Sequence, residues 1–392
     1  MLTRKLAVPL VNEKILAQAV HCYIATARIT DGGFDFLKSR IPPKCRVDVV
    51  IGAAELTSPR VLRRILNNYS DTISLKIHTR GALNANVYIF ELPFRKSVAF
   101  VGSGMLSLEG LKDQEELFWK LTTPKEIESL FSWFTSFFEF GTPLSDLIID
   151  EYDLLYPNAI RRDFSLKDVF KEAILRSNIA WDSLKWKNQF FKLEHYRALA
   201  QFSTGDKSPA STQDVWEQLL SLQRRLAPKV AAMKLFPVNT DNTETSNVLE
   251  TRSVWIAFSR KESGFNPGFA YLQLGVTSIS FAVRIFFHGG QEYSLERKRM
   301  GEVVPDEKTL DAFSKLHRYI LRVAHMEKPL EDFQARVLQE MLANDPDHLF
   351  PIAIEKQIAP GDSSLNMDRI EDAIVQEFVI LKQLLQILAA ES

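Results

Sequence analysis

The first third of the chain alternates short apolar runs with polar turn signals, a pattern typical of a sheet with intervening helices. Runs rich in β-branched and aromatic residues predict buried strands. Between them, Ser58 followed by Pro59 is typical of a helix start and predicts a helix over residues 60–69. A second helix is predicted over residues 124–140. The predicted strands cover residues 21–29, 46–52, 73–79, 86–92, 97–103 and 115–121.

This order of elements favours an α/β fold, a mixed sheet covered by helices on both faces. Asp31 to Gly33 are expected to form a turn before a short helical segment over residues 34–40. Residues 146–165 are expected to form a connecting segment that carries a short acidic helix. We therefore predict a first domain over residues 1–145 and a second over residues 166–392.

The second domain is predicted to be α+β, mostly helical, with a small antiparallel sheet. Asp214 precedes an amphipathic helix that is expected to stop before Pro228. The last helix is apolar almost all round, so it is either buried or part of an interface. Strands are predicted over residues 254–260 and 269–287, polar loops over 203–212 and 237–252, and helices over 166–202, 307–326, 329–343 and 368–390.

Composition narrows the class of protein. A length of 392 residues favours two domains, and 46% hydrophobic residues are enough for two cores. A net charge of −1 provides no global field toward nucleic acid or membrane. The only cysteines, Cys22 and Cys45, are expected to be buried thiols, with neither a disulfide framework nor zinc spacing. No apolar run has the length of a signal or a membrane span, so we expect a soluble cytoplasmic protein. We also expect neither a metal nor a cofactor.

Residues 84–118 carry the most informative pattern. One strand begins with Asn84 and Asn86, the next ends in Gly102 and Ser103, and Met105, Gly110, Leu111 and Glu116 follow. The region resembles the signature of the phospholipase D-like phosphodiesterases, in particular their restriction-endonuclease and DNA-defence branch, over about residues 14–145. That family carries His-x-Lys, then Gly-Ser-x-Asn, a Gly-Leu turn and a Glu. Here asparagine replaces both His and Lys, and Met105 replaces Asn.

The resemblance implies a metal-free mechanism in which one His forms a phosphohistidine and a second His, from another copy of the motif, acts as acid and base. An asparagine amide can do neither, because its nitrogen lone pair is delocalised into the carbonyl. Asn86 also lacks the charge with which lysine holds a phosphoryl group. We therefore expect a catalytically degenerate site, in which Ser103 holds a turn and Glu116 lies in solvent or with a local partner.

Two other groups of residues carry functional alternatives. His78 and Arg80 form a His-x-basic pair that could replace the lost motif as nucleophile and phosphate clamp, although the end of a strand is the simpler interpretation. Lys185 and Lys187 lie among aromatic residues at 181–197, a pattern that can bind nucleic acid or form the core and the solvated face of one helix. The basic cluster Arg297, Lys298 and Arg299 could likewise contact phosphate.

Three functions follow. The first is a non-catalytic scaffold that forms a homodimer through the phospholipase D-like domain. By the resemblance, it would belong to a bacterial DNA-processing or defence complex with an ATPase, helicase or nuclease partner. The second is a nucleic-acid-binding module that uses the vestigial groove through Asn84, Asn86 and Ser103. The third is a metal-independent nuclease or phospholipase that uses His78.

Overall fold

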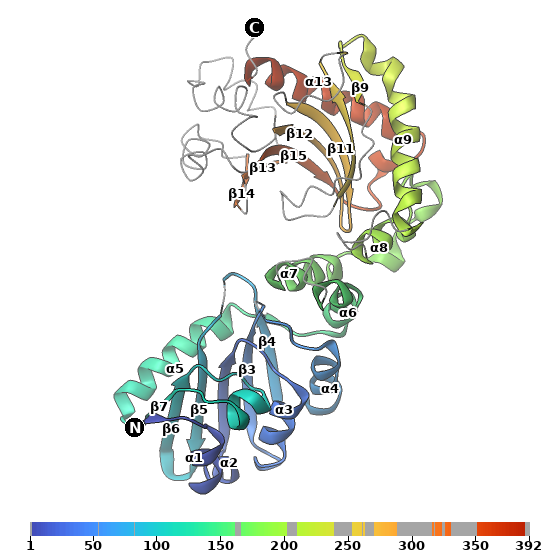
Figure 1. Cartoon of the computed structure of the whole chain (residues 1–392). Helices are drawn as coiled ribbons and strands as arrows, with labels where there is room; N and C mark the ends of the chain where they lie inside the picture. Colours follow the sequence, from blue (N-terminus) through green and yellow to red (C-terminus); the bar gives the residue numbers. More distant parts are fainter. Residues whose placement is uncertain are drawn as a thin grey trace. The chain divides into compact units, whose positions relative to one another are not determined.

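The chain packs into two compact units, Met1–Asn178 and Ile179–Ser392, each considered by itself (Figure 1). The second unit thus begins at Ile179 instead of at residue 166, the predicted start of the second domain. The computed structural model describes residues 2–53, 55–81, 83–160, 166–201, 210–238, 253–260, 262, 270–287, 316, 318–323, 326–330 and 351–388.

The first unit is built on an eight-stranded mixed sheet in the order β1-β7-β6-β5-β2-β3-β4-β8. Strands β2, β3 and β4 are parallel, and their other neighbours pair antiparallel. The strands are β1 (Leu2–Thr3), β2 (His21–Thr26), β3 (Arg46–Gly52), β4 (Ile73–His78), β5 (Asn86–Leu92), β6 (Lys96–Gly102), β7 (Phe118–Leu121) and β8 (Thr142–Pro143). The predicted strand positions are confirmed, apart from one to three residues at some ends.

Helices cover both faces of this sheet, as the pattern predicted (Figure 1). The helices of the first unit are α1 (Ala7–Asn12), α2 (Ile15–Gln18), α3 (Asp31–Lys38), α4 (Pro59–Tyr69), α5 (Pro124–Glu139), α6 (Asp146–Ile160) and α7 (Leu166–Ser177), with the short turns η1 (Pro93–Arg95) and η2 (Glu109–Asp113). Ile127 and Phe134 of α5 pack on Tyr23 and Ile89 of the sheet. The pairing in this sheet places the beginning of β5 between the ends of β2 and β6.

Residues 31–33, predicted to be a turn, form the first turn of α3 instead. The hydroxyl of Thr30 accepts a hydrogen bond from the Gly33 backbone N–H at 3.2 Å and so caps the helix. Gly33 lies so close to the Leu106 carbonyl that an added Cβ would meet it at 2.2 Å. The glycine therefore serves close packing of the helix and not a turn.

Helices α6 and α7 belong to the first unit. Helix α6 occupies most of the segment over 146–165, which was expected to carry a short acidic helix. Tyr152 of α6 stacks on Phe170 of α7, with ring centroids 3.9 Å apart. Its hydroxyl donates a hydrogen bond to the Thr57 carbonyl at 2.8 Å. Arg63 of α4 pairs with Asp150 at 2.8 Å. The acidic residues of α6 thus provide ion-pair partners for Arg63 of α4.

The second unit is an α+β fold with an antiparallel sheet, as predicted. Its strands follow the order β14-β13-β15-β12-β11-β10-β9. They are β9 (Phe236–Val238), β10 (Ser253–Ser259), β11 (Tyr271–Thr277), β12 (Phe281–Phe287), β13 (Tyr319–Val323), β14 (Met326–Pro329) and β15 (Ile352–Ile358). The described helical elements are η3 (Trp181–Ser183), η4 (Trp186–Asn188), α8 (Leu193–Gln201), α9 (Ala210–Ala231), η7 (Ser363–Leu365) and α13 (Ile370–Leu388).

Strands β13 and β14 correct the two helices predicted over residues 307–326 and 329–343; the rest of those ranges lies outside the described residues, apart from Leu316, Arg318 and Leu330. Short apolar runs do not distinguish strand from helix. Pairing with β15 supplies the ladder of hydrogen bonds that decides for a strand. Strand β9 begins at Phe236 and extends into the first two residues of the predicted loop over 237–252.

Helix α9 continues through Pro228 to Ala231, so the prediction that it stops before the proline is wrong. Leu226 and Val230 on either side of the proline are both fully buried in the second unit's core. Their packing on the sheet outweighs the backbone hydrogen bond that proline removes. Tertiary contact therefore extends the helix beyond a local stop signal.

The apolar helix α13 lies in the core, which resolves the choice between burial and interface. Its core residues are Ile370, Ile374, Phe378, Leu381, Leu384 and Leu385. Among the helices described, none combines the length and the apolar character needed to cross a bilayer.

Candidate functional site

The motif edge is the end of the first sheet that carries Thr26, Gly52, His78, Asn86 and Gly102. Parallel strands β2, β3 and β4 end here, whereas antiparallel β5 begins here opposite the end of β6. Asn86 is paired in register with Gly102, and Gly52 with His78. The sheet therefore brings together the residues that the sequence pattern singled out.

Asn86 is a structural residue at this edge, 2% exposed. Its Oδ1 accepts hydrogen bonds from the Thr26 hydroxyl at 2.8 Å and from the Ala27 N–H at 3.2 Å. Its Nδ2 donates to the Ser103 carbonyl at 2.9 Å. The amide thus ties β2 to the end of β6 and uses the groups with which it would have held a phosphate.

Asn84 and Met105 do not join this network. Asn84 is exposed in the segment before β5. Met105 is half-buried, and its backbone lies against Gly110, where an added Cβ would meet its N at 2.6 Å. Only one of the two asparagines that replace the family's His and Lys therefore lies within the fold.

Ser103 and Glu116 hydrogen-bond to each other. The Ser103 hydroxyl also accepts from the Leu117 N–H at 3.1 Å, and the Glu116 N–H donates to the Arg4 carbonyl at 3.0 Å. Ser103 is exposed and Glu116 half-buried. The pair fastens the segment before β7 to the end of β6, in agreement with the expected turn and local partner.

His78 ends β4 and is 8% exposed. Its ring packs edge-on against Phe137, with centroids 4.9 Å apart, and its Nδ1 is buried with no hydrogen-bond partner among the described residues. Burial, followed by the charge of Arg80, lowers the pKa of His78. Arg80 is exposed and lies over the Phe140 ring at 4.7 Å. The geometry gives His78 neither an orienting partner nor an open approach, both of which a nucleophile needs.

Arg28 is a residue of the motif edge that the sequence pattern did not reveal. It follows β2 directly, and its carbonyl accepts from the Thr26 hydroxyl at 3.1 Å. The guanidinium is half-buried, and its Nε is buried with no hydrogen-bond partner among the described residues. The signal available in the sequence was a cation among the last residues of the strand predicted over 21–29.

The predicted basic clusters lie in the second unit. Lys185 and Lys187 are exposed, whereas the aromatic residues around them are in the core. The stretch is not one helix, since η3 and η4 precede α8. The Lys192 amine donates to the Trp186 carbonyl at 2.7 Å. Residues 288–300, with Arg297, Lys298 and Arg299, lie outside the described residues.

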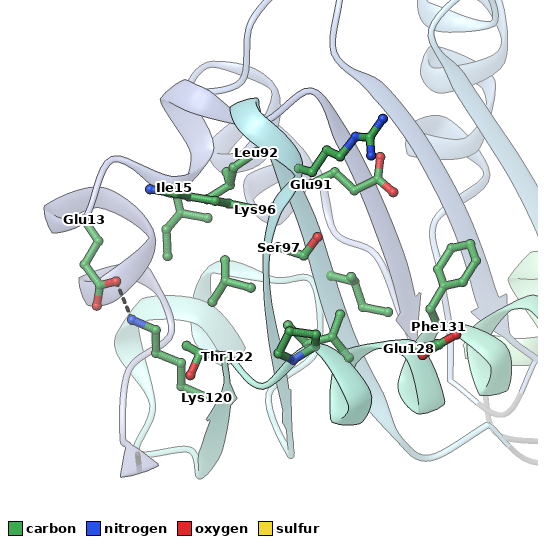
Figure 2. A pocket seen from close by; sticks show the side chains of 15 residues that line it. Glu13, Ile15, Glu91, Leu92, Lys96, Ser97, Lys120, Thr122, Glu128 and Phe131 are labelled. Atoms are coloured by element: carbon green, nitrogen blue, oxygen red, sulfur yellow. Dashed lines mark hydrogen bonds and ion pairs between the residues drawn. The ribbon is translucent and has the colours of Figure 1, made fainter.

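Among the residues that the structure describes, two pockets of the first unit stand out, and neither includes a residue of the motif edge. One, of 640 Å³, lies at the opposite end of the strands, beside the β5–β6 hairpin (Figure 2). The other, of 890 Å³, lies between α1, α3 and η2. Within the ranges that the structure describes, no three His, Cys, Asp or Glu side chains gather as metal ligands would.

Comparison with known proteins finds no matching family model and no matching curated protein. Among solved structures, the chain is similar to NucT from Helicobacter pylori, at 16% identity over 35% of this chain and 91% of that one, with a TM-score of 0.28. It is also similar to TrmBL2, described as an archaeal chromatin protein with a novel mode of DNA binding. That likeness has 14% identity over 37% of this chain and 53% of the other, with a TM-score of 0.26. At these values neither likeness assigns a function.

Proposed function

We propose that this protein is a non-catalytic phospholipase D-like subunit that acts in assembly. One observation carries the proposal: Asn86, at the position of the family's lysine, is buried and hydrogen-bonded to Thr26, Ala27 and Ser103. The phosphate-holding charge has been replaced by a group that holds strands together.

The rest of the motif edge supports the same conclusion. The Asn84 amide has no nucleophilic lone pair on nitrogen and does not titrate near neutral pH, so it can act neither as nucleophile nor as acid or base. His78 packs against Phe137. The Ser103–Glu116 pair remains, but as a fastening of the backbone. A fold that is retained without its catalytic residues is consistent with a role in binding other proteins and not in catalysis.

We further propose which class of protein this subunit assembles with. The pattern over residues 84–118 resembles the DNA-defence branch of the family, which supports a place in a bacterial DNA-processing or defence complex with an ATPase, helicase or nuclease. The second unit, with its own core, would supply the contact surface. Affinity retrieval from the native host, followed by reconstitution with the retrieved protein, tests this partner.

The deciding experiment is a cleavage assay in EDTA on labelled single- and double-stranded DNA and RNA. We expect no cleavage above background from the whole protein. A His78→Gln variant is the matched control. Cleavage by the wild type that the variant abolishes would overturn the proposal and establish the His78 nuclease in its place; cleavage that survives in the variant would also overturn it.

A second candidate, nucleic-acid binding at the motif edge, is favoured by Arg28. A half-buried guanidinium whose Nε lacks an acceptor can bind a phosphate oxygen. Glu109 lies nearby: hydrogen bonds from its own backbone N–H and from Ser107 lower its pKa, and the charge of Arg28 contributes further. Fluorescence anisotropy with single-stranded DNA at several salt concentrations should show weaker binding and a shallower salt slope for Arg28→Gln than for the wild type.

A further inference from the structure

The tip of the β5–β6 hairpin has a strained backbone. Phe94 has φ 61° and ψ 33°, and Arg95 has φ 57°. Two consecutive left-handed residues in a hairpin turn normally require Asn or Gly, because a Cβ is disfavoured there. The Phe94 ring is also 93% exposed. The chain therefore exposes a large apolar ring on a strained turn, and a ring exposed to this degree gains little packing energy within its own chain.

A pocket adjoins this tip. Its volume is 640 Å³, within the range of about 300–1,000 Å³ typical of ligand sites, so it can admit an aromatic ring. The wall formed by α5 presents Phe131 and Glu128, whereas Lys96 and Ser97 belong to β6 (Figure 2). Leu92, Arg95 and Lys96 line both the hairpin end and the pocket. The apolar lining is formed by Ile15, Ile89, Leu92, Val98, Ile127 and Phe131.

Charges at the tip and on the wall are of opposite sign. Arg95 and Lys96 follow Phe94 in the chain and are exposed, while Glu128 is exposed on α5. Glu91 accepts a hydrogen bond from the Tyr23 hydroxyl at 3.2 Å. On the far side of the pocket, Glu13 pairs with Lys120 (Figure 2). One surface thus contains both a basic projection with an apolar ring and an apolar hollow with an acidic wall.

We propose that two copies of this chain associate by placing the Phe94 ring of each in the pocket of the other. Such an isologous contact needs projection and hollow side by side on one surface, with charges that complement their own copy across a two-fold axis. A different partner would need only one of the two features, so their juxtaposition favours a second copy.

This dimer goes beyond the proposed function and does not depend on it. The hairpin and the motif edge lie at opposite ends of β5, a strand of seven residues and so roughly 20 Å long. Two copies joined at the hairpins keep their motif edges apart. The dimer therefore differs from the one that the family resemblance implies, in which two motifs meet. A catalytic or an inactive protein could form it equally.

Mass photometry and light scattering of the whole protein, from nanomolar to micromolar, test the proposal. The wild type should form a dimer of twice the 44.8 kDa chain mass. Phe94→Gly should weaken it at least about tenfold, as expected when a central aromatic anchor is removed. Phe140→Ala, which removes another exposed ring (59%) near the other end of the sheet, should leave it unchanged.

A melting measurement and a charge-swap series keep the test independent of folding. Phe94→Gly should melt no earlier than the wild type, because glycine tolerates the left-handed backbone. Lys96→Glu and Glu128→Lys should each weaken the dimer, and the double variant should recover it. A wild type that stays monomeric at micromolar concentration overturns the proposal, as does a dimer that survives Phe94→Gly or a double variant that does not recover. None of these results bears on the cleavage assay.

Discussion

At the scale of single residues, Asn86 has a structural role in the first sheet. Its amide is 2% exposed and offers no open approach to a ligand. It accepts from the Ala27 N–H, which would otherwise be buried without an acceptor, and from the Thr26 hydroxyl, which also donates to the Arg28 carbonyl. The residue that most directly argues against catalysis therefore also contributes to stability.

We predict that Asn86→Ala lowers the free energy of unfolding by about 2–3 kcal/mol, since each buried polar group left without a partner costs about 1–3 kcal/mol. Chemical denaturation followed by circular dichroism measures this change. Asn84→Ala is the control and should stay within about 0.5 kcal/mol, because Asn84 is exposed. Equal stability of the Asn86 variant and the wild type would contradict the structural role.

At the scale of elements, ion pairs join α9 to α13. Glu371 of α13 pairs with Arg225 and, at 3.0 Å, with Lys229 of α9. Lys229 also contacts Asp372 at 2.8 Å. Burial by itself would raise the pKa of Glu371, but hydrogen bonds from Lys229 and Arg225 outweigh it and hold the pKa below its ordinary value. The ion pairs therefore stabilise the folded state only while Glu371 is ionised.

The sign of the pH dependence follows from that lowered pKa. The stabilisation is complete above the unfolded-state pKa, about 4.3 for Glu, and is lost as the pH falls through the lower folded-state value. We expect Glu371→Gln to cost up to about 1 kcal/mol at pH 7, and the difference from the wild type to shrink as the pH falls below the unfolded-state value. Urea titrations at neutral and acidic pH measure it. A difference that stays constant with pH would rule out the ion pairs as its origin.

At the scale of the whole molecule, each unit has its own core. Tyr152 joins α6 to the first unit through Phe170 and the Thr57 carbonyl. A fragment of residues 1–178 should therefore unfold cooperatively on heating, whereas a fragment of residues 1–145, which ends at the boundary predicted from sequence, should melt at least several degrees lower. Differential scanning calorimetry compares the two. Equal melting temperatures would show that α6 and α7 add nothing to the first unit.

The sequence by itself determined most of the first sheet. Local signals agree there: polar residues or glycine end the apolar runs, and Ser58 before Pro59 starts α4 as predicted. The pattern over residues 84–118 also singled out Asn86 and Ser103, which the structure joins by a hydrogen bond at one edge of the sheet. The chemical argument against catalysis needed only residue types, since an amide is not a nucleophile wherever it lies.

Tertiary structure decided what local pattern cannot encode. Pairing with β15 turned residues 319–323 into a strand, and core packing carried α9 past Pro228. Burial distinguished Asn86 from Asn84, two identical side chains two residues apart. Likewise, the pocket beside Phe94 is lined from α2, β5, β6 and α5. Such outcomes depend on contacts between segments far apart in the chain, whose energies outweigh propensities of a few tenths of a kcal/mol per residue.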